Sequence, residues 1–558
     1  MGKRILLTSV FGPFGVDDAW GRKENIMELF HNQVTKAQGM ASLRVHHRSF
    51  GLDFLAANVE SPVQVLDFPS RREFIRTLKR EPFDIVGISF IVPNFVKARE
   101  MARLVRSLQP GAEIILGGHG AAIEGVEQLI PCDHVVKGEG IRWLRQHLGE
   151  DPDRPFVHPS IPSSDHKRVF GIPYEGKGGL LVPGVGCVNG CRFCATSHFF
   201  GKEYTSFFET GAELFWNACR IAKDLGTDDL FIMDENFFKQ EARARELLAL
   251  MEYHQRPLRF GLFSSAEAIE SFGVENMVRL GVDFVWLGAE SRRETYAKNQ
   301  GRDLPALVRR LRDHGILVLA SGILFLEDHT PENIQDDIDF MIELEADMTQ
   351  FMMFTAMPVT ALYQDLKARG LLDFDLPYEE WHGQHELNWR HPHFSSAEAQ
   401  RVLGDAFRQE YDRNSSSILR LAQTALRGIV TLEEPARTDP WLAIRRDQIR
   451  AYALRFRLLM PTLRCFAHNP LERRRVAELG QAFQTVLGPM PLGSRVLSMG
   501  ALALAGIQTL RTALFGDMSQ PSMRLTRYRW PKEGSGLGAW LGKAVASPRK
   551  APAGVPGS

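Results

Sequence analysis

Gly186-Cys187-Val188-Asn189-Gly190-Cys191-Arg192-Phe193-Cys194 is a loop with three cysteines in eight residues, spaced C-x3-C-x2-C. It follows an apolar run, residues 180–185, which predicts a buried strand. Thiolates at this spacing can bind three irons of a four-iron cluster and leave the fourth iron open to a small ligand. The two glycines let the backbone pass close to such a cluster. A structural zinc site is the alternative, with His198 as a fourth ligand, but such sites usually need four closed ligands.

The composition is that of an ordinary globular chain. Its 558 residues suffice for roughly three or four domains. Lys+Arg and Asp+Glu both number 67, so no overall charge favours nucleic acid as a partner. The other cysteines, Cys132, Cys219 and Cys465, are scattered and form no disulfide framework. With an N-terminal apolar run too short for a signal peptide, these features predict a reducing, cytoplasmic location.

Residues 1–150 alternate between strand and helix patterns. The apolar runs lie at residues 5–10, 63–66, 85–89, 114–116 and 134–136. This order predicts an α/β domain with a doubly wound, Rossmann-like parallel sheet and helices on both faces. Ligands of such sheets bind beyond the carboxyl ends of the strands. The residues at those ends are Ser89, Gly117, Gly118, Gly138, Glu139 and Gly140.

Three segments of this domain, Asp84–Ser89, Ile114–His119 and Asp133–Gly140, resemble the cobalamin-binding domain of B12-dependent radical S-adenosylmethionine (SAM) enzymes. The cysteine spacing resembles the signature of the radical SAM core in the same enzymes. The resemblance implies that the six residues at the strand ends contact cobalamin. The Asp-x-His-x-x-Gly motif, whose histidine binds cobalt in many cobalamin domains, is not found. We therefore expect cobalamin without a cobalt ligand from this domain. A domain that has lost its cofactor is the alternative.

A polar, proline-rich stretch, residues 151–175, predicts a linker. Residues 176–370 then alternate again, with candidate strands at 180–185, 229–233, 259–263, 283–287, 317–323 and 349–354. Six βα units predict a partial, TIM-like (β/α)6 barrel, as in the radical SAM family. Active residues of such barrels cluster at the carboxyl ends of the strands.

Polar residues follow several of these strands. The resemblance implies that Asp234, Glu235 and Asn236 bind the amino group of SAM and that Phe193 packs against its adenine. Glu290 lies in a Gly-x-Glu-Ser stretch that recurs in the cobalamin-type members, and Ser264 is a further SAM candidate. Helix capping is the alternative role for such residues. Residues 296–301 either line the substrate side or form an exposed loop.

The C-terminal third, residues 371–543, is predicted to be mainly helical, and residues 544–558 to be a disordered tail. Residues 381–393 are rich in histidine and aromatics, which favours either a second metal site or a polar lid. Residues 496–510 carry no charge but are too few for the ~20 needed to span a bilayer. This run is either buried in a helical subdomain or lies at a membrane interface.

The resemblance to cobalamin-dependent radical SAM enzymes covers about residues 1–395. It implies a [4Fe-4S] cluster reduced by an external donor of the flavodoxin or ferredoxin type. It also implies SAM cleavage to a 5′-deoxyadenosyl radical, and methyl transfer from cobalamin to an unactivated carbon. With 36 phenylalanines against 9 tyrosines, we expect a hydrophobic small molecule or lipid as substrate, and a peripheral membrane contact.

Three alternatives stay open on the sequence alone. A radical SAM cyclase or rearrangement enzyme would have a similar layout. A radical methylthiotransferase would carry three more cysteines in the N-terminal domain, where residues 1–150 hold only Cys132. A non-enzymatic iron–sulfur or cobalamin-binding sensor would not need polar residues at several strand ends.

Overall fold

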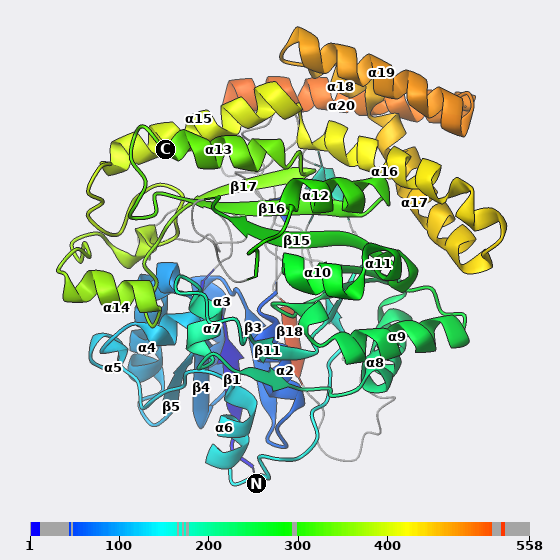
Figure 1. Cartoon of the computed structure of the whole chain (residues 1–558). Helices are drawn as coiled ribbons and strands as arrows, with labels where there is room; N and C mark the ends of the chain where they lie inside the picture. Colours follow the sequence, from blue (N-terminus) through cyan, green and yellow to red (C-terminus); the bar gives the residue numbers. More distant parts are fainter. Residues whose placement is uncertain are drawn as a thin grey trace.

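The computed structural model describes residues 2–11, 44–45, 48–163, 167–169, 172–174, 178–292, 298–515 and 526–529. The predicted tail, residues 544–558, lies outside the described residues. Two large sheets and a set of C-terminal helices make up the described part (Figure 1).

The N-terminal sheet has the strand order β18-β3-β1-β4-β5-β6. Its strands are β1 (Ile5–Thr8), β3 (Val63–Asp67), β4 (Ile85–Ser89), β5 (Glu113–Gly117), β6 (His134–Val135) and β18 (Thr526–Arg529). The strands from β3 to β6 are parallel, which confirms the predicted sheet. The edge strand β18 is an addition from the C-terminal third, which was predicted to be mainly helical, and it pairs antiparallel with β3.

Helices cover both faces of this sheet, as a doubly wound domain requires. They are α2 (Phe50–Ala57), α3 (Arg71–Arg80), α4 (Phe95–Leu108), α5 (Val126–Leu129) and α6 (Gly140–His147). Alternate residues of β1 enter different cores because successive side chains of a strand point to opposite faces. Leu6 packs in the cluster that contains Phe74 of α3, whereas Leu7 packs in the one that contains Leu52 of α2.

The barrel sheet has the order β17-β16-β15-β14-β13-β10-β7. Its strands are β7 (Ile161–Pro162), β10 (Gly179–Leu181), β13 (Asp229–Ile232), β14 (Arg259–Phe263), β15 (Val282–Glu290), β16 (Leu317–Leu324) and β17 (Met348–Met353). The six strands from β10 to β17 are parallel, which confirms the partial (β/α)6 barrel. The barrel helices are α8 (Gly211–Leu225), α9 (Glu241–Tyr253), α10 (Ala266–Phe272), α11 (Val274–Leu280), α12 (Leu304–Asp313), α13 (Ile334–Glu343) and α14 (Ala361–Ala368).

Local structure at the start of the barrel differs from the prediction. The predicted strand 180–185 is two strands, β10 and β11 (Gly184–Gly186), since Pro183 between them has no N–H to continue the ladder. β11 instead pairs antiparallel with β12 (Tyr204–Ser206). The predicted linker contains β7 and two further short strands, β8 (Lys167–Val169) and β9 (Ile172–Tyr174), which form a small sheet with β2 (Arg44–Val45).

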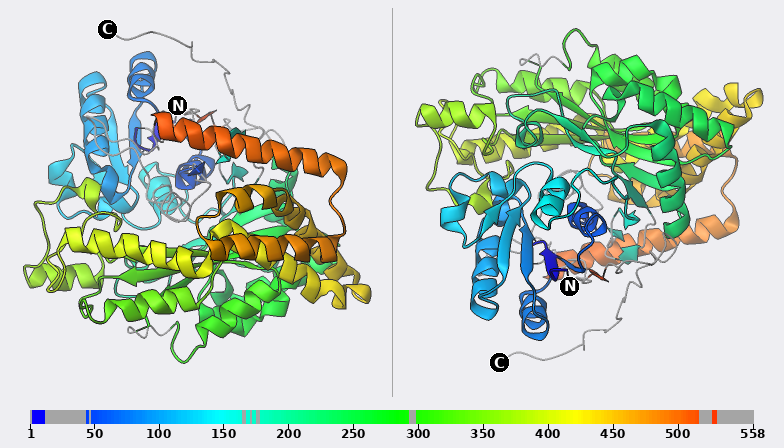
Figure 2. Two further views of the ribbon diagram at one scale, coloured as in Figure 1. Left: turned by 90° about the horizontal axis from the view of Figure 1, so that it is seen from above. Right: turned by 90° about the horizontal axis from the view of Figure 1, so that it is seen from below.

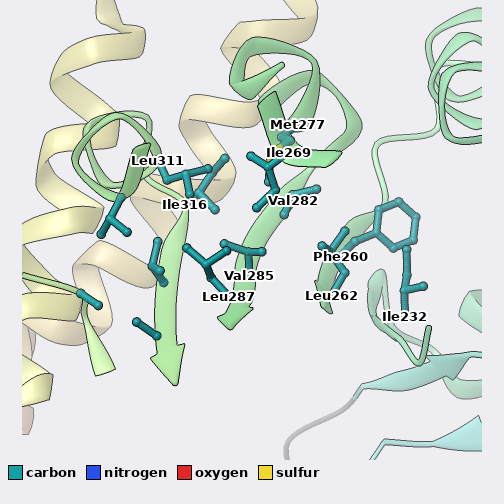
Figure 3. Packing of buried hydrophobic residues seen from close by; sticks show 14 of the residues in the cluster. Ile232, Phe260, Leu262, Ile269, Met277, Val282, Val285, Leu287, Leu311 and Ile316 are labelled. Carbon is teal, nitrogen blue, oxygen red and sulfur yellow. The ribbon is translucent and has the colours of Figure 1, made fainter. Parts of the chain in front are cut away.

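The core of the barrel lies between its strands and its helices. Figure 3 shows Ile232, Leu262 and Leu287 on one face of the sheet, among residues such as Met277 and Leu311 of the surrounding helices. All of these side chains are buried. The opposite face of the same strands points into the barrel, where several side chains, such as Phe231, Phe263 and Trp286, are only partly buried.

The C-terminal third is helical, as expected, apart from β18. Its helices are α15 (Ser396–Asn414), α16 (Ser417–Glu433), α17 (Pro440–Leu458), α18 (Met460–Phe466), α19 (Pro470–Leu487) and α20 (Leu492–Phe515). They pack on the barrel through α15 against β17, α16 against α12 and α17 against α11. Figures 1 and 2 show α15 to α19, in yellow to orange, on the barrel, whereas α20 extends from them toward the N-terminal domain.

Residues 381–393 lie between the two sheets. Trp381 and Trp389 are 1% and 2% exposed, in one hydrophobic cluster with Phe90 and Phe95 of the N-terminal domain and Phe354 of the barrel. Among the described residues, which include this whole segment, its histidines do not bring three metal-ligating atoms together. The described residues thus give no support to a second metal site in this segment, and the polar lid stays a prediction. The segment is part of a core shared by both domains.

Candidate functional site

The cysteine loop joins β11 to α7 (Ala195–Phe199). All three thiols are partly buried. The buried Ser197 side chain fixes the loop, because its hydroxyl donates to Cys187 O (2.6 Å) and accepts from Gly190 N (3.1 Å). Gly186 has a φ of +93°, and a Cβ there would collide with the carbonyl oxygen of Glu203. The tight backbone expected around a cluster is therefore present.

The spacing of the thiols separates the two metal interpretations. In a mononuclear zinc site each Zn–S bond is about 2.3 Å, so two sulfurs lie at most about 4.6 Å apart. The sulfurs of Cys187, Cys191 and Cys194 do not all lie within 4.8 Å of one another, and neither do any two of them with a nitrogen of His198. The arrangement fits a larger cluster better than a single zinc ion.

Burial also affects the protonation of the loop. It raises the pKa of the Cys187 and Cys191 thiols, and raises that of Cys194 to about 12. The thiols are therefore protonated at neutral pH until a metal binds. Since thiolates are the metal ligands, loading of this loop releases protons.

Two of the three polar residues after β13 support the strand end. Buried Asp234 accepts hydrogen bonds from Tyr204 (2.6 Å) and from Arg243 of α9 (3.0 Å). Asn236 accepts from the hydroxyl of Ser264 at 3.1 Å, so Ser264 bonds to a neighbouring strand end instead of capping a helix. Sequence reasoning proposed Asp234, Asn236 and Ser264 as SAM contacts, and the structure brings all three to the barrel mouth.

Glu235 differs from its two neighbours. Its side chain is exposed, and within the described residues it has no hydrogen bond or ion pair. Glu235 is accessible to water, but protein surrounds it at the mouth of the barrel. Desolvation and the Asp234 carboxylate raise the pKa of Glu235 to about 7. The charge of Glu235 adds to the effect of burial in raising the pKa of Cys187 and Cys194.

Glu290 ends β15 in an unusual backbone conformation. Its φ is +64°, and the pairing of β15 with β16 shifts register between Gly288 and Glu290. A side chain held in this region stores strain, which is common at functional sites. The shift directs Glu290 to Lys298, with which it forms a buried ion pair.

Lys298 links Glu290 to the cysteine loop. Burial opposes its charge, but Glu290 outweighs burial and raises the pKa of Lys298. Its ammonium lies 6.0 Å from the ring centroid of Phe193 and favours the thiolate form of Cys191. The stretch 296–301 thus supplies a buried residue of the site. Residues 296 and 297 lie outside the described residues.

The residues predicted for cobalamin lie at the carboxyl edge of the N-terminal sheet. Ser89 of β4 pairs in register with Gly117 of β5, and no atom would meet a Cβ at Gly117 within 4 Å. Gly118 has a φ of +78°, and a Cβ there would press on Phe90 O at 2.6 Å. Glu139 caps α6 through the backbone N–H groups of residues 141 and 142. Among these glycines, Gly117 borders open space, which leaves room for a ligand at that point of the edge.

Comparisons with known proteins agree with this geometry. Residues 39–145 match the B12 binding domain family. An uncharacterized methyltransferase of Pyrococcus horikoshii is 22% identical, over 65% of this chain and 87% of its own length. The bacteriochlorophyllide d C-8(2)-methyltransferase of Chlorobaculum tepidum is 24% identical, over 55% and 72%. The anaerobic magnesium-protoporphyrin IX monomethyl ester cyclase of Rubrivivax gelatinosus is 23% identical, over 53% and 60%.

The fold matches a solved structure of the radical S-adenosylmethionine methyltransferase TsrM from Kitasatospora setae, which has cobalamin and a [4Fe-4S] cluster bound. The TM-score is 0.50 at 16% identity, over 81% of this chain and 99% of TsrM. This chain is a homologue of the cobalamin-dependent radical SAM methyltransferases. Its N-terminal sheet lies largely within the part that matches the B12 binding domain family, and its barrel has the fold of the one in TsrM.

The B12-binding domain presents its glycine edge to the barrel beside the cysteine loop. His119, at this edge, stacks on Phe199 of α7 with ring centroids 4.7 Å apart. A Cβ at Gly138 would lie 3.8 Å from Phe199 O. Burial lowers the pKa of His119 to about 4, so its ring is neutral. The two candidate cofactor sites are therefore neighbours across α7.

Sequence reasoning missed Ser197, Tyr204, Arg243 and the role of Lys298. None of them belongs to a motif with recognisable spacing. Arg243 lies on α9 and Tyr204 on the short strand β12. In the sequence, each looks like an ordinary surface or core residue. The available signal was their position in the sequence. Tyr204 belongs to an element that precedes β13, and Arg243 belongs to the helix that follows its polar end.

Proposed function

We propose that this protein is a cobalamin-dependent radical SAM enzyme that methylates an unactivated carbon of a hydrophobic small molecule or lipid. The observation that carries the proposal is the contact between the glycine edge of the B12-binding domain and α7, directly after the cysteine loop. Bound at these places, a [4Fe-4S] cluster, SAM and cobalamin supply hydrogen abstraction and methyl transfer at a carbon that no acid or base can ionise.

The residues at the mouth of the barrel have separate roles in this proposed function. Cys187, Cys191 and Cys194 hold the cluster. Glu235 is the exposed carboxylate beside the thiols, so it is suited to the ammonium of SAM. Glu290 and Lys298 place a buried pair of opposite charges against the same loop. The flavodoxin- or ferredoxin-type electron donor stays a prediction.

The inner face of the barrel supports a hydrophobic substrate. Phe231, Phe263 and Trp286 are only partly buried, and their rings form a continuous row with centroids 5.2 and 5.1 Å apart. Partly buried Met348 and Met352 extend this surface around Leu319. Aromatic and methionine side chains that remain partly accessible inside a barrel favour an apolar ligand over a sugar or nucleotide.

A cyclase is the second candidate, favoured by one observation. The cyclase of Rubrivivax gelatinosus aligns with 53% of this chain, so a shared layout does not separate ring formation from methylation. The two reactions differ in what happens to the substrate. Methylation adds a carbon that comes from SAM, whereas a cyclisation joins atoms already present.

The mass of the product decides between them. The full chain, loaded anaerobically with iron, sulfide and cobalamin, is incubated with a reductant, trideuteromethyl SAM and lipid extract of its host. We expect one lipid-soluble compound to gain a trideuteromethyl group. The variant in which Cys187, Cys191 and Cys194 are replaced by alanine should give no labelled product. A product that loses hydrogen without gaining label would support the cyclase. Labelling confined to the aqueous fraction would contradict the hydrophobic substrate.

Helix α20 supports a peripheral membrane contact. The interpretation of residues 496–510 as a buried run is wrong, because Val496, Ile507 and Leu510 are 66%, 63% and 62% exposed. Apolar residues recur at intervals of three and four along one face, between Arg495 and Arg511. Among the described residues, no helix is long and apolar enough to cross a bilayer. We therefore propose that α20 lies on the surface of an anionic bilayer.

Removing this apolar face is expected to weaken vesicle binding. Replacing Val496, Ile507 and Leu514 by glutamine should abolish co-sedimentation of the full chain with vesicles of phosphatidylcholine and phosphatidylglycerol, because the buried apolar area that anchors the helix is lost. The matched control replaces Leu129, Val157 and Val430, which are also exposed but lie elsewhere. Equal binding of both triple variants, or none by the unmodified chain, would contradict the proposal.

A further inference from the structure

A cluster of metal-ligating side chains lies far from the cysteine loop, at the opposite edge of the N-terminal sheet. It consists of Glu113 at the start of β5, His134 at the start of β6 and His147 at the end of α6. One ligand atom from each lies within 4.8 Å of the others. The fold brings them together because His134 pairs with Ile115, two residues after Glu113. Glu113 and His134 therefore leave the sheet on the same face, under α6.

The two imidazoles converge on a single oxygen. Nε2 of His134 lies 2.6 Å from Oε1 of Glu113, and Nε2 of His147 lies 2.7 Å from the same atom. Despite this short distance, the buried Nε2 of His147 makes no hydrogen bond within the described residues. Lys3 approaches the other carboxylate oxygen, Oε2, at 3.3 Å. The two ring nitrogens and Oε1 thus lie close together at one place on the domain.

Trp143 holds the two rings in place. It stacks on His147 with centroids 5.0 Å apart and an interplanar angle of 8°, and its centroid lies 5.5 Å from that of His134. Rings oriented by packing lose little freedom when they take up a ligand. The side chains of Glu113, His134 and His147 are 20%, 39% and 20% exposed, so an ion can enter from solvent.

We propose that Glu113, His134 and His147 bind one divalent transition metal ion, with zinc as the best fit. Two imidazoles and a carboxylate are a common zinc ligand set, and they leave a fourth position for water. Bonds of about 2.0–2.2 Å would separate the ligand atoms to roughly 3.3 Å, a small side-chain rotation for partly exposed residues. The ion would join β5, β6 and α6 at the amino ends of the strands. The site is independent of the proposed function.

The test uses the full chain with its cysteine loop already loaded with iron and sulfide, so that the thiols do not compete. Isothermal titration with zinc chloride should show one bound zinc ion and a rise in Tm. His147→Gln should lose both, because one of the three ligands is gone. His314→Gln is the matched control. His314 follows α12 in the barrel, 3.9 Å from Glu275 of α11, so this variant should bind zinc as the unmodified chain does.

A second variant covers the case in which His147→Gln does not fold. Glu113→Gln keeps the shape of the side chain but removes its charge, and it should also lose zinc. Cobalt added in place of zinc should give a spectrum of nitrogen and oxygen ligands. Unchanged zinc binding in either folded variant, no zinc uptake by the unmodified chain, or a thiolate charge-transfer band with cobalt would overturn the proposal.

Discussion

Replacing Cys187, Cys191 and Cys194 together by alanine is expected to abolish iron binding and all product formation. The unmodified chain, reconstituted anaerobically, should hold about four irons. The variant should hold none, since these three thiols are the ones that the loop brings together. The measurements are iron and sulfide content, the visible absorption spectrum, and release of 5′-deoxyadenosine from SAM.

The remaining cysteines provide the control. Cys132, Cys219 and Cys465 lie outside the loop, so replacing all three by alanine should leave the iron content unchanged. Loss of iron in this control would show that the cluster has a different ligand set. Retention of four irons by the loop variant would contradict the assignment directly.

Replacing Arg243 by methionine is expected to lower the free energy of unfolding of the barrel by about 3–5 kcal/mol. The side chains of Arg243 and Asp234 are 4% and 2% exposed, so the change leaves a carboxylate buried without its cation. Tyr204 and the backbone N–H of Asn236 would remain to bond it. The measurement is urea-induced unfolding of the full chain, followed by tryptophan fluorescence.

Two further variants separate the buried charge from general damage. Asp234→Asn in the Arg243→Met background removes the unpaired charge and should recover a large part of the lost stability. Arg245→Met, on the same helix, breaks the exposed pair with Glu241 and should lower the free energy of unfolding much less. An equal loss of unfolding free energy in Arg243→Met and Arg245→Met would show that the buried pair contributes no more to stability than the exposed pair.

Local patterns predicted much of this molecule because they depend on neighbours in sequence. The cysteine loop is a spacing of three thiols and two glycines. Both parallel sheets follow from strand and helix periodicity, and the polar ends of β13 and β15 follow from the order of the barrel. These features need no knowledge of distant contacts.

The missed features depend on contacts between distant segments. Lys298 becomes a site residue only because a register shift turns Glu290 toward it. The sequence of the apolar run on α20 is compatible with either burial or exposure. Periodicity identifies the apolar face of a helix but does not show whether that face packs against another element. The edge strand β18 pairs with β3, which lies near the other end of the sequence. No local pattern predicts this pairing.

The core shared through Trp381 and Trp389 has a consequence for cooperativity. Because residues of both domains bury their side chains in one cluster, neither domain can unfold without exposing apolar surface of the other. A ligand that binds only the folded N-terminal domain must then also stabilise the barrel, by thermodynamic linkage. The same core opposes hinge motion between the domains. The distance between the glycine edge and the cysteine loop is therefore set when the chain folds, before any ligand arrives.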